Sequence, residues 1–401
     1  MKILYVHQYF KTPDEGGCVR SYHLAKGLAN AGHEVLMLSG HNNKSGREEL
    51  DGIQIHYFKI PYRNEFGFVR RVWAFLRFVW KSKQLINQLS QRFDLAYVMT
   101  TPLTTGLIAM HAKSRLNIPY YFEVGDLWPE APIKMGAVRN EFLKRFLYQF
   151  EKKCYFEAQK VIALSPAIRN YIEVTAPETK VHVVTNFADT DFYEATRKIQ
   201  QFSTDNPLKV GYFGTFGPAN GLNALLSVAK TCLELKVPVE FTLMGDGKEY
   251  DTIKKATKRF TNVRVIPFGN AEQVKEELET QDAVYVSFKN LEILSTGSPN
   301  KFFDGLAAGK LIVMNFGGWI RTLVERNKCG FYHDPSDAME FIRKLKVFIQ
   351  DPILLQQYQK QSRALAESYY SKELQVNKLL KILNNEKHLS VSDSEVYILT
   401  A

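Results

Sequence analysis

Residues 208–235 read LKVGYFGTFGPANGLNALLSVAKTCLEL, and the order of residue types in this stretch decides the fold class. Apolar and aromatic residues at 210–213 predict a short buried strand, and the run from Gly221 to Leu235 predicts a helix. A loop rich in glycine separates the two. A strand, a glycine loop and a helix in this order are typical of the opening unit of a doubly wound α/β domain.

The same alternation of strand and helix continues on both sides of this stretch. Towards the C-terminus the sequence predicts strands at 240–244, 263–267, 283–288 and 311–315, and a helix at 301–308. Near the N-terminus it predicts strands at 2–6, 34–38, 53–58, 95–99 and 120–124, and helices at 21–31 and 103–115. Apolar strands separated by helices indicate parallel sheets that are covered on both faces.

The length of the chain, 401 residues, indicates two domains, because a single core rarely grows beyond about 250–300 residues. We predict a Rossmann-like domain over residues 1–190 and a second one over 191–370, joined by a polar linker at 201–207. Residues 371–401 are predicted to form a C-terminal helix that returns toward the first domain, followed by a tail.

The composition is ordinary apart from its charge and its aromatic content. Hydrophobic residues make up 45% and charged residues 23%, which excludes a disordered or collagen-like chain. Lys and Arg number 52 against 42 Asp and Glu, which gives a net charge of +10, and 13% of residues are aromatic. Such an excess of positive charge favours nucleic acid, an anionic membrane surface or phosphorylated substrates as partners.

The cysteines and the hydrophobic runs bear on the compartment. Four cysteines lie far apart in the sequence, at 18, 154, 232 and 329, and predict neither a metal knuckle nor a redox motif. No secretion signal is predicted, and no run of about 18 apolar residues could span a bilayer. We therefore expect a cytoplasmic protein.

Two glycine loops occupy equivalent places, one in each predicted domain. Gly16 and Gly17 lie between the first strand and its helix, as Gly214, Gly217 and Gly221 do in the second domain. Glycine lets backbone N–H groups approach a ligand closely, and the helix that follows directs its positive dipole end there. The alternative is a plain turn in each place. Two matching loops favour a ligand held between the domains.

The segment LSTGSPNKFFDGLAAGK, at 294–310, holds the densest set of candidate ligand-binding groups. Small residues and hydroxyls precede a helix that is predicted to start at Pro299 or Asn300, where free amides and Lys301 would face a phosphate. Asp304 follows one turn later, with a carboxylate suited to a diol such as ribose. The alternative is a capped amphipathic helix with Asp304 on its solvated face.

With these motifs in order, the chain resembles the retaining glycosyltransferases of family 4, which have two Rossmann-like domains that face each other across a cleft, the GT-B fold. The resemblance covers nearly all of residues 1–380. It rests on the first glycine loop, Ser165-Pro166, Asn186, Gly245-Asp246-Gly247 and SPNKFFDGLAAGK at 298–310. It is greatest to bacterial enzymes of O-antigen or capsule synthesis, including transferases of N-acetylated amino sugars such as L-fucosamine.

The resemblance implies roles for individual residues. Asp304 matches a glutamate that holds the ribose hydroxyls, but the family's preceding glutamate is Thr296 here, and two cations of its second glycine loop are replaced by Thr215 and Asn220. Lys301 and the amides of 297–300 are then the expected pyrophosphate ligands. The residues expected to bind the nucleotide-sugar are Gly16, Gly17, Gly214, Thr215, Asn220, Gly245, Asp246, Thr296, Gly297, Ser298, Pro299, Asn300, Lys301 and Asp304.

Candidates for the acceptor and for catalysis lie in the first domain. Asp126, just past a strand, resembles a residue that contacts acceptor or sugar in relatives, and it could accept the proton of an attacking hydroxyl. Its alternative role is to cap the helix that Pro129 begins. Glu130 and Arg20 are further acceptor candidates. Lys301, with the amides, would stabilise the leaving diphosphate.

No Asp-x-Asp motif is evident where a metal-dependent transferase would use one, and the histidines are not spaced as metal ligands. We therefore expect metal-independent transfer with no cofactor besides the nucleotide-sugar donor, expected to be a UDP-sugar.

Residues 61–84, PYRNEFGFVRRVWAFLRFVWKSKQ, interleave basic and aromatic side chains. On a helix, aromatic residues would anchor in the acyl boundary of a bilayer while cations meet anionic head groups. The residues expected to contact a membrane are Phe66, Phe68, Arg70, Arg71, Trp73, Arg77 and Trp80. A second such stretch lies at 144–156. The alternative is a core-facing helix with solvated arginines.

The combined expectation is a glycosyltransferase, peripherally bound to the inner face of the cell membrane, that extends a polyprenyl-diphosphate-linked glycan of a surface polysaccharide. A nucleic-acid partner is not expected, although interleaved aromatics and cations can also stack bases. Two alternatives stay open: a catalytically inactive GT-B scaffold at a membrane complex, and a sugar-nucleotide epimerase.

Overall fold

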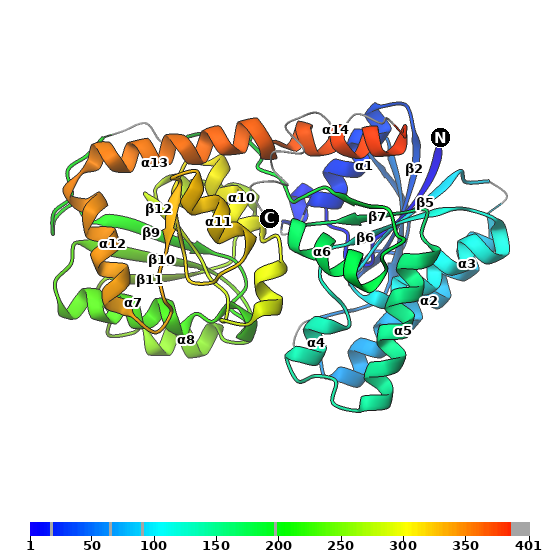
Figure 1. Ribbon diagram of the computed structural model, residues 1–401, viewed down its shortest axis with the longest axis horizontal. Coiled ribbons are helices and arrows are strands. Elements are labelled where there is room, and N and C mark those ends of the chain that lie inside the picture. Colours follow the sequence, from blue (N-terminus) through cyan, green and yellow to red (C-terminus); the bar gives the residue numbers. More distant parts are fainter. Residues whose placement is uncertain (17–18, 64–65, 90–91, 196–198, 386–401) are drawn as a thin grey trace. The chain divides into compact units, whose positions relative to one another are not determined.

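The computed structural model describes residues 1–16, 19–63, 66–89, 92–195 and 199–385, in two compact units (Figure 1). The first unit comprises Met1–Thr185, Thr296–Ser298 and a segment that begins at Val376. The second comprises Asn186–Ser295 and Pro299–Gln375. The chain therefore leaves the first unit five residues before the boundary predicted after residue 190, and the segment predicted as a linker, 201–207, lies inside the second unit.

The described residues of the first unit form an eight-stranded sheet in the order β3-β4-β2-β1-β5-β6-β7-β8. All neighbours pair in parallel except β3, which runs antiparallel to β4 at the edge. The strands are β1 (Lys2–Val6), β2 (Glu34–His41), β3 (Gly46–Leu50), β4 (Ile53–Lys59), β5 (Leu95–Met99), β6 (Tyr120–Val124), β7 (Lys160–Ala163) and β8 (Val181–Val183).

Helices cover both faces of this sheet, as Figure 1 shows. The helical segments are η1 (Pro13–Glu15), α1 (Arg20–Asn30), α2 (Phe68–Gln88), η2 (Leu103–Thr105), α3 (Gly106–Leu116), α4 (Glu130–Lys134), α5 (Glu141–Glu157) and α6 (Pro166–Thr175). Helix α14 (Lys372–Leu383) starts in the second unit and, from Val376 onward, belongs to the first. Its Leu379 and Ile382 join Leu24 and Leu28 of α1 in one buried apolar cluster with β1 and β2.

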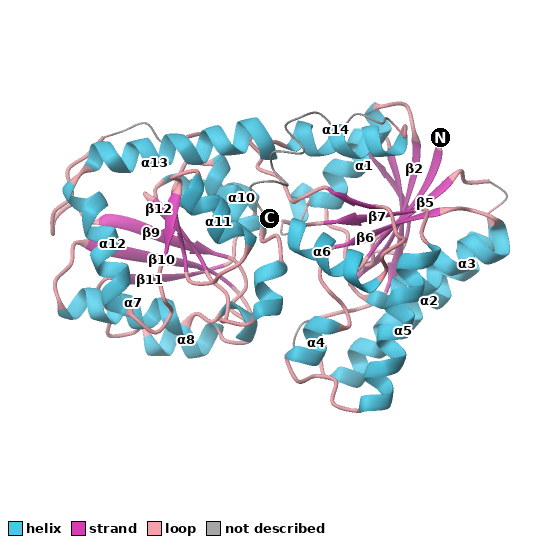
Figure 2. Cartoon of the chain, viewed as in Figure 1, coloured by secondary structure: helices cyan, strands magenta, loops and turns pink. Residues whose placement is uncertain are grey.

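The described residues of the second unit form a six-stranded parallel sheet in the order β11-β10-β9-β12-β13-β14. Figure 2 shows its strands among helices. Its strands are β9 (Leu208–Phe213), β10 (Val239–Gly245), β11 (Val263–Pro267), β12 (Ala283–Val286), β13 (Leu311–Met314) and β14 (Gly330–Tyr332). Its helical segments are η3 (Pro218–Asn220), α7 (Asn223–Glu234), α8 (Tyr250–Ala256), α9 (Ala271–Glu279), η4 (Glu292–Thr296), α10 (Asn300–Ala307), α11 (Trp319–Arg326), α12 (Ala338–Gln350), α13 (Pro352–Leu365) and η5 (Ala366–Tyr370).

Two α/β units with mainly parallel sheets confirm the predicted fold class. The sequence did not reveal the edge strand β3, because GREEL is polar and almost fully exposed, and so lacks the apolar signal of a buried strand. The helix of the quoted stretch begins at Asn223, two residues later than predicted, since Gly221 adopts a left-handed φ of 59° after the short η3 turn.

Candidate active site

The loops that follow β9 and β10 are joined by backbone hydrogen bonds. The amide of Gly214 donates to the Met244 carbonyl at 3.0 Å, and that of Phe216 donates to the Asp246 carbonyl at 2.8 Å. A Cβ atom at Gly245 would lie 1.9 Å from the Gly214 carbonyl oxygen, so only glycine fits there. Gly214 and Gly245, both predicted to bind the nucleotide-sugar, thus also have a structural role: they let the two loops meet at the carboxyl edge of the sheet.

Thr215 and the Asp246 side chain reach solvent at this edge. The Thr215 carbonyl accepts a hydrogen bond from the Tyr212 hydroxyl at 2.8 Å, and the Asp246 carboxylate accepts one from the amide of Gly247 at 2.7 Å. The side chain of Thr215 therefore stays open to a ligand, while Asp246 is partly occupied in its own turn.

Lys301 reaches from the first turn of α10 to the end of β9. Its Nζ donates to the Tyr212 hydroxyl at 2.9 Å and to the Asn220 Oδ1 at 3.1 Å, and it lies 4.2 Å from the centre of the Tyr212 ring. A Cβ at Gly214 would be 3.4 Å from the same Nζ. None of these partners is a carboxylate, and burial lowers the pKa of Lys301 to about 7.

The start of α10 agrees with the prediction. The helix begins at Asn300 with Pro299 at its N-cap, and no side chain caps the first amides. The preceding Thr296, Gly297 and Ser298 group with the first unit, where the Ser165 hydroxyl donates to the Thr296 carbonyl at 2.5 Å.

Asp304 lies one turn further along α10 and is half-buried. Burial, and then the nearby Asp189 carboxylate, raise the pKa of Asp304 to about 7. Asp189 is itself paired with Lys372, at 2.8 Å. Among the described residues the Asp304 carboxylate has no hydrogen bond or ion pair, and its raised pKa contradicts the alternative of a solvated helix face.

Asp126 follows β6 and faces solvent, beside the loop that follows β5. Burial of its surroundings raises the pKa of the Asp126 carboxyl, and a hydrogen bond with Thr101 opposes that rise. The alternative role as a helix cap is wrong, because α4 begins at Glu130 and Pro129 occupies its N-cap. Asp126 therefore does not cap α4, which was the structural role that the sequence left open.

Arg20 and Glu130, the other acceptor candidates, are engaged within the first unit. Arg20 is 2% exposed, and its Nε lies 3.0 Å from Glu123. The rest of its guanidinium donates to the carbonyls of Val184 and Thr185. Arg20 therefore cannot meet a ligand, and its prediction as an acceptor residue is wrong. Sequence alone did not show that Glu123, inside a strand, points beneath α1.

Glu130 connects two helices of the first unit. It accepts a hydrogen bond from the Tyr148 hydroxyl of α5 and lies 3.6 Å from Lys134. With its carboxylate used in this way, Glu130 is better explained as a link between α4 and α5 than as a ligand for the acceptor.

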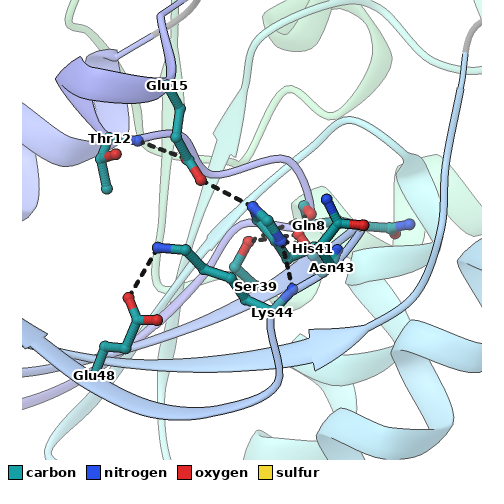
Figure 3. Close-up of polar contacts among 9 residues, drawn as sticks. Gln8, Thr12, Glu15, Ser39, His41, Asn43, Lys44 and Glu48 are labelled. Carbon is teal, nitrogen blue, oxygen red and sulfur yellow. Dashed lines mark hydrogen bonds and ion pairs between the residues drawn. The ribbon is translucent and has the colours of Figure 1, made fainter.

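The segment that leads into the first glycine loop is held by a hydrogen-bond network that the sequence did not predict (Figure 3). The His41 Nε2 lies 2.8 Å from the Glu15 carboxylate, whose other oxygen accepts the Thr12 amide at 3.1 Å. The Nδ1 of the same histidine accepts the amides of Asn43 and Lys44. Gly16 has a φ of 65°, which glycine allows. Gly17 lies outside the described residues.

From Phe68 onward the basic aromatic stretch forms α2, and several of its aromatic side chains face outward. Trp73 is 66% exposed, Trp80 57% and Phe68 60%, whereas Phe75 and Phe78 face the core. The alternative of a core-facing stripe is therefore wrong for the exposed rings. Arg70 and Arg77 are also exposed, and Phe66 lies half-buried beneath the Arg70 guanidinium at 3.7 Å.

Helix α5 has a similar face, with Phe142 87% and Phe146 63% exposed. Among the helices of the described residues, none has the length and apolar character that crossing a membrane requires. No three His, Cys, Asp or Glu side chains gather as a metal site in that part of the chain.

Two known protein-family models match the chain, one in each half. Residues 15–186 match the family model described as glycosyl transferase 4-like domain, and residues 194–365 match that of glycosyl transferases group 1. The chain is a family 4-like glycosyltransferase. Both matched domains are those of transferases, so the epimerase and inactive-scaffold alternatives gain no support.

Individual relatives are distant. An uncharacterized glycosyltransferase of Haemophilus influenzae is 22% identical over 363 residues, which cover 88% of this chain and 92% of that protein. Among solved structures, the Anabaena protein Alr3699/HepE, determined with UDP and glucose, has a TM-score of 0.69 at 18% identity over 96% of this glycosyltransferase and 100% of that chain. Sucrose-phosphate synthase of Thermosynechococcus elongatus has a TM-score of 0.75 at 13% identity, covering 96% and 98%. These likenesses show the GT-B fold.

Proposed function

We propose that this glycosyltransferase transfers a sugar, with retention of anomeric configuration and without a metal, from a UDP-sugar to a lipid-linked glycan. The sugar is an N-acetylated hexosamine or deoxyhexosamine, and the acceptor is a polyprenyl-diphosphate-linked intermediate of O-antigen or capsule synthesis. A UDP donor is supported by the UDP complexes of the similar Anabaena protein, and the lipopolysaccharide setting by similarity to WaaG, described as a glycosyltransferase of lipopolysaccharide biosynthesis (TM-score 0.64, 12% identity).

The observation that carries the proposal is the position of Lys301. Relatives place a cation in the second glycine loop, where this chain has Asn220; here the Lys301 Nζ lies 3.1 Å from the Asn220 side chain. The charge therefore comes from α10 instead of from the loop, and it reaches the Asn220 side chain of that loop. A cation without a carboxylate partner at the end of a parallel strand is suited to a diphosphate.

Transfer breaks the bond between the anomeric carbon and the diphosphate oxygen, and the electron pair leaves with UDP. Charge therefore develops on the leaving oxygen, which Lys301 and the uncapped amides at the start of α10 stabilise. Burial lowers the pKa of Lys301 to about 7, and an adjoining diphosphate would raise it and keep the ammonium charged. Asp304, without a partner of its own, accepts the ribose hydroxyls.

Asp126 is the acid–base group that we assign to the acceptor. The attacking hydroxyl must lose its proton as the new glycosidic bond forms, and a carboxylate with a raised pKa accepts a proton more readily than an ordinary aspartate. Thr101, which shares a hydrogen bond with it, orients the carboxylate.

The exposed face of α2 supports a peripheral position at the inner face of the cell membrane. Trp73 and Trp80 would enter the acyl boundary, and Arg70 and Arg77 would meet anionic head groups. The exposed Phe142 and Phe146 of α5 add a second apolar contact. A lipid-linked acceptor requires such a position, because its polyprenyl chain stays in the bilayer.

Thermal-shift titration tests the proposal, because a ligand that binds only the folded state stabilises it by an amount that grows with the logarithm of the ratio of ligand concentration to Kd. UDP should raise Tm, and Lys301→Met should greatly reduce the shift, while Lys230→Gln, an exposed lysine of α7 that pairs with Glu234, should keep it. Absence of any shift with UDP would refute the UDP donor; equal shifts in all three proteins would refute the role of Lys301.

A further inference from the structure

Two tyrosines and an arginine from three separate elements meet at the carboxyl edge of the first sheet. Tyr9 follows β1, Tyr62 follows β4, and Arg71 lies in the first turn of α2. The rings of Tyr9 and Tyr62 are 4.8 Å apart, and the Arg71 guanidinium lies 5.7 Å from the centre of the Tyr62 ring. We call these three residues the Tyr–Arg cluster.

The cluster contains donors that lack acceptors. The Tyr9 hydroxyl is buried and lies beside the Tyr62 side chain, but no hydrogen bond of good geometry joins it to a partner among the described residues. Arg71 is half-buried, and its side chain has no ion pair or hydrogen bond in that part of the chain. Burial and Tyr62 raise the pKa of Tyr9, and Arg71 opposes this, which places the guanidinium close enough to act on the phenol. An anion with several oxygens would satisfy these groups together.

Aromatic contacts extend from the cluster toward Asp126. The Tyr62 ring stacks on Phe75 at 5.8 Å, and Phe75 contacts Trp128 at 6.3 Å. Trp128 lies two residues after Asp126 and is half-buried. Aromatic faces of this kind support the apolar faces of sugar rings, so the row leads from the cluster to the proposed acid–base group.

We propose that the Tyr–Arg cluster binds a phosphate group of the lipid-linked acceptor. The inference rests on the proposed function and names the part of the acceptor that the first unit recognises. A guanidinium offers a planar pair of N–H donors that matches phosphate, and the unpaired phenol donates a further hydrogen bond. The lipid side of the phosphate then faces α2 and its exposed rings, and the sugar side faces Trp128.

A headgroup of the bulk membrane is the other source of phosphate. Arg70 and Arg77, on the same helix, are exposed and suit headgroups. Arg71, in contrast, is half-buried and lies over the Tyr62 ring, which itself packs against Tyr9 and Phe75. These differences favour a single phosphate that enters the protein.

Calorimetric titration with citronellyl diphosphate, a water-soluble prenyl diphosphate, tests this in the full-length protein. Excess UDP is present throughout, so that the donor site is already occupied. Arg71→Gln should weaken binding of the probe by at least about tenfold, since it removes a charged hydrogen-bond donor, and Tyr9→Phe by a few-fold, since it removes the phenol donor. Arg115→Gln, an exposed arginine of α3, should bind the probe as the wild type does.

Vesicles of phosphatidylglycerol without acceptor separate the two sources. Arg77→Gln should weaken vesicle binding and leave the soluble probe unaffected, whereas Arg71→Gln should do the opposite. Probe binding unchanged by Arg71→Gln, or lost equally in Arg115→Gln, would overturn the proposal, as would an effect of Arg71→Gln on vesicles alone. If the wild type binds UDP but not the probe, the phosphate site fails while the proposed transferase stands; if it does not bind UDP, the proposed donor fails first.

Discussion

Arg20 and Lys301 make an instructive comparison, because each is a cation in a helix that follows a small-residue loop, one in each unit, Arg20 being buried and Lys301 half-buried. Arg20 lies 3.0 Å from the carboxylate of Glu123 and also donates to two backbone carbonyls. Among the described residues, the Lys301 ammonium donates hydrogen bonds to a phenol and an amide oxygen and lies over two aromatic rings, with no carboxylate beside it. A cation that has its own carboxylate stabilises the fold, and one that lacks it leaves its charge available to a ligand.

The pKa values point the same way. Burial alone would lower the pKa of Arg20, but Glu123 and Tyr97 raise it above its ordinary value. For Lys301 burial acts unopposed and the pKa falls to about 7. The identity of the partner, more than the depth of burial, therefore separates a structural cation from a candidate binding residue.

The largest expected effect is on stability. Arg20→Met should lower the free energy of unfolding by about 3–5 kcal/mol, because it leaves Glu123 charged and buried without its partner. Chemical denaturation measures this. The double variant Arg20→Met, Glu123→Met should recover most of the loss, since an apolar pair of similar volume avoids the desolvation penalty. A single variant as stable as the wild type would show that the pair is not structural.

The next effect is on catalysis. Lys301→Met should lower kcat about 100- to 1000-fold, which is the typical effect of removing one donor to a developing negative charge. Its Tm without ligand should not fall, because burial disfavours the charged form of this lysine. Turnover of a UDP-sugar with a membrane extract as acceptor provides the measurement. A variant that loses stability and activity together would place Lys301 with Arg20 as a structural residue.

A smaller effect, on membrane binding, is expected for the exposed arginines of α2, which form no ion pair among the described residues. Arg70→Gln with Arg77→Gln should weaken binding to phosphatidylglycerol vesicles by about 2 kcal/mol, since each basic residue near an anionic surface contributes about 1 kcal/mol. Flotation of the protein with vesicles measures the bound fraction. Phe68→Ser with Trp73→Ser should release the protein even at high salt, where the arginines no longer matter; unchanged flotation of both double variants would exclude α2 as the contact.

The fold was largely readable from sequence, because apolar strands that alternate with helices leave a strong periodic signal. Lys301 with Asp304, and separately the glycines of the second loop, could be proposed as candidates from the sequence, since the members of each group lie within a few residues of one another along the chain. The pairing of Arg20 with Glu123 was not, because 103 residues separate them and only the sheet brings them together. Contacts made across the chain decide which candidate is already engaged, and single-sequence patterns do not contain them.

The smallest effect is a pH dependence in which the two α10 side chains act in opposite directions. Burial lowers the pKa of Lys301 to about 7, and burial together with Asp189 raises that of Asp304 to about 7. Above pH 7 the lysine loses the charge that binds the diphosphate, and below pH 7 the aspartate gains a proton and accepts the ribose hydroxyls poorly. UDP affinity should therefore be greatest near pH 7 and fall by up to about tenfold per pH unit on either side.

Each variant should remove one limb of this profile. Lys301→Met should bind UDP weakly but with no further loss above pH 7, and Asp304→Asn should lose the wild type's additional weakening below pH 7. UDP itself takes up a proton near a pH of about 6, so the acid limb is the difference between the wild type and Asp304→Asn, titrated side by side. If both variants retain the full profile, the titrating groups lie elsewhere and the contrast between Lys301 and Arg20 does not extend to ligand binding.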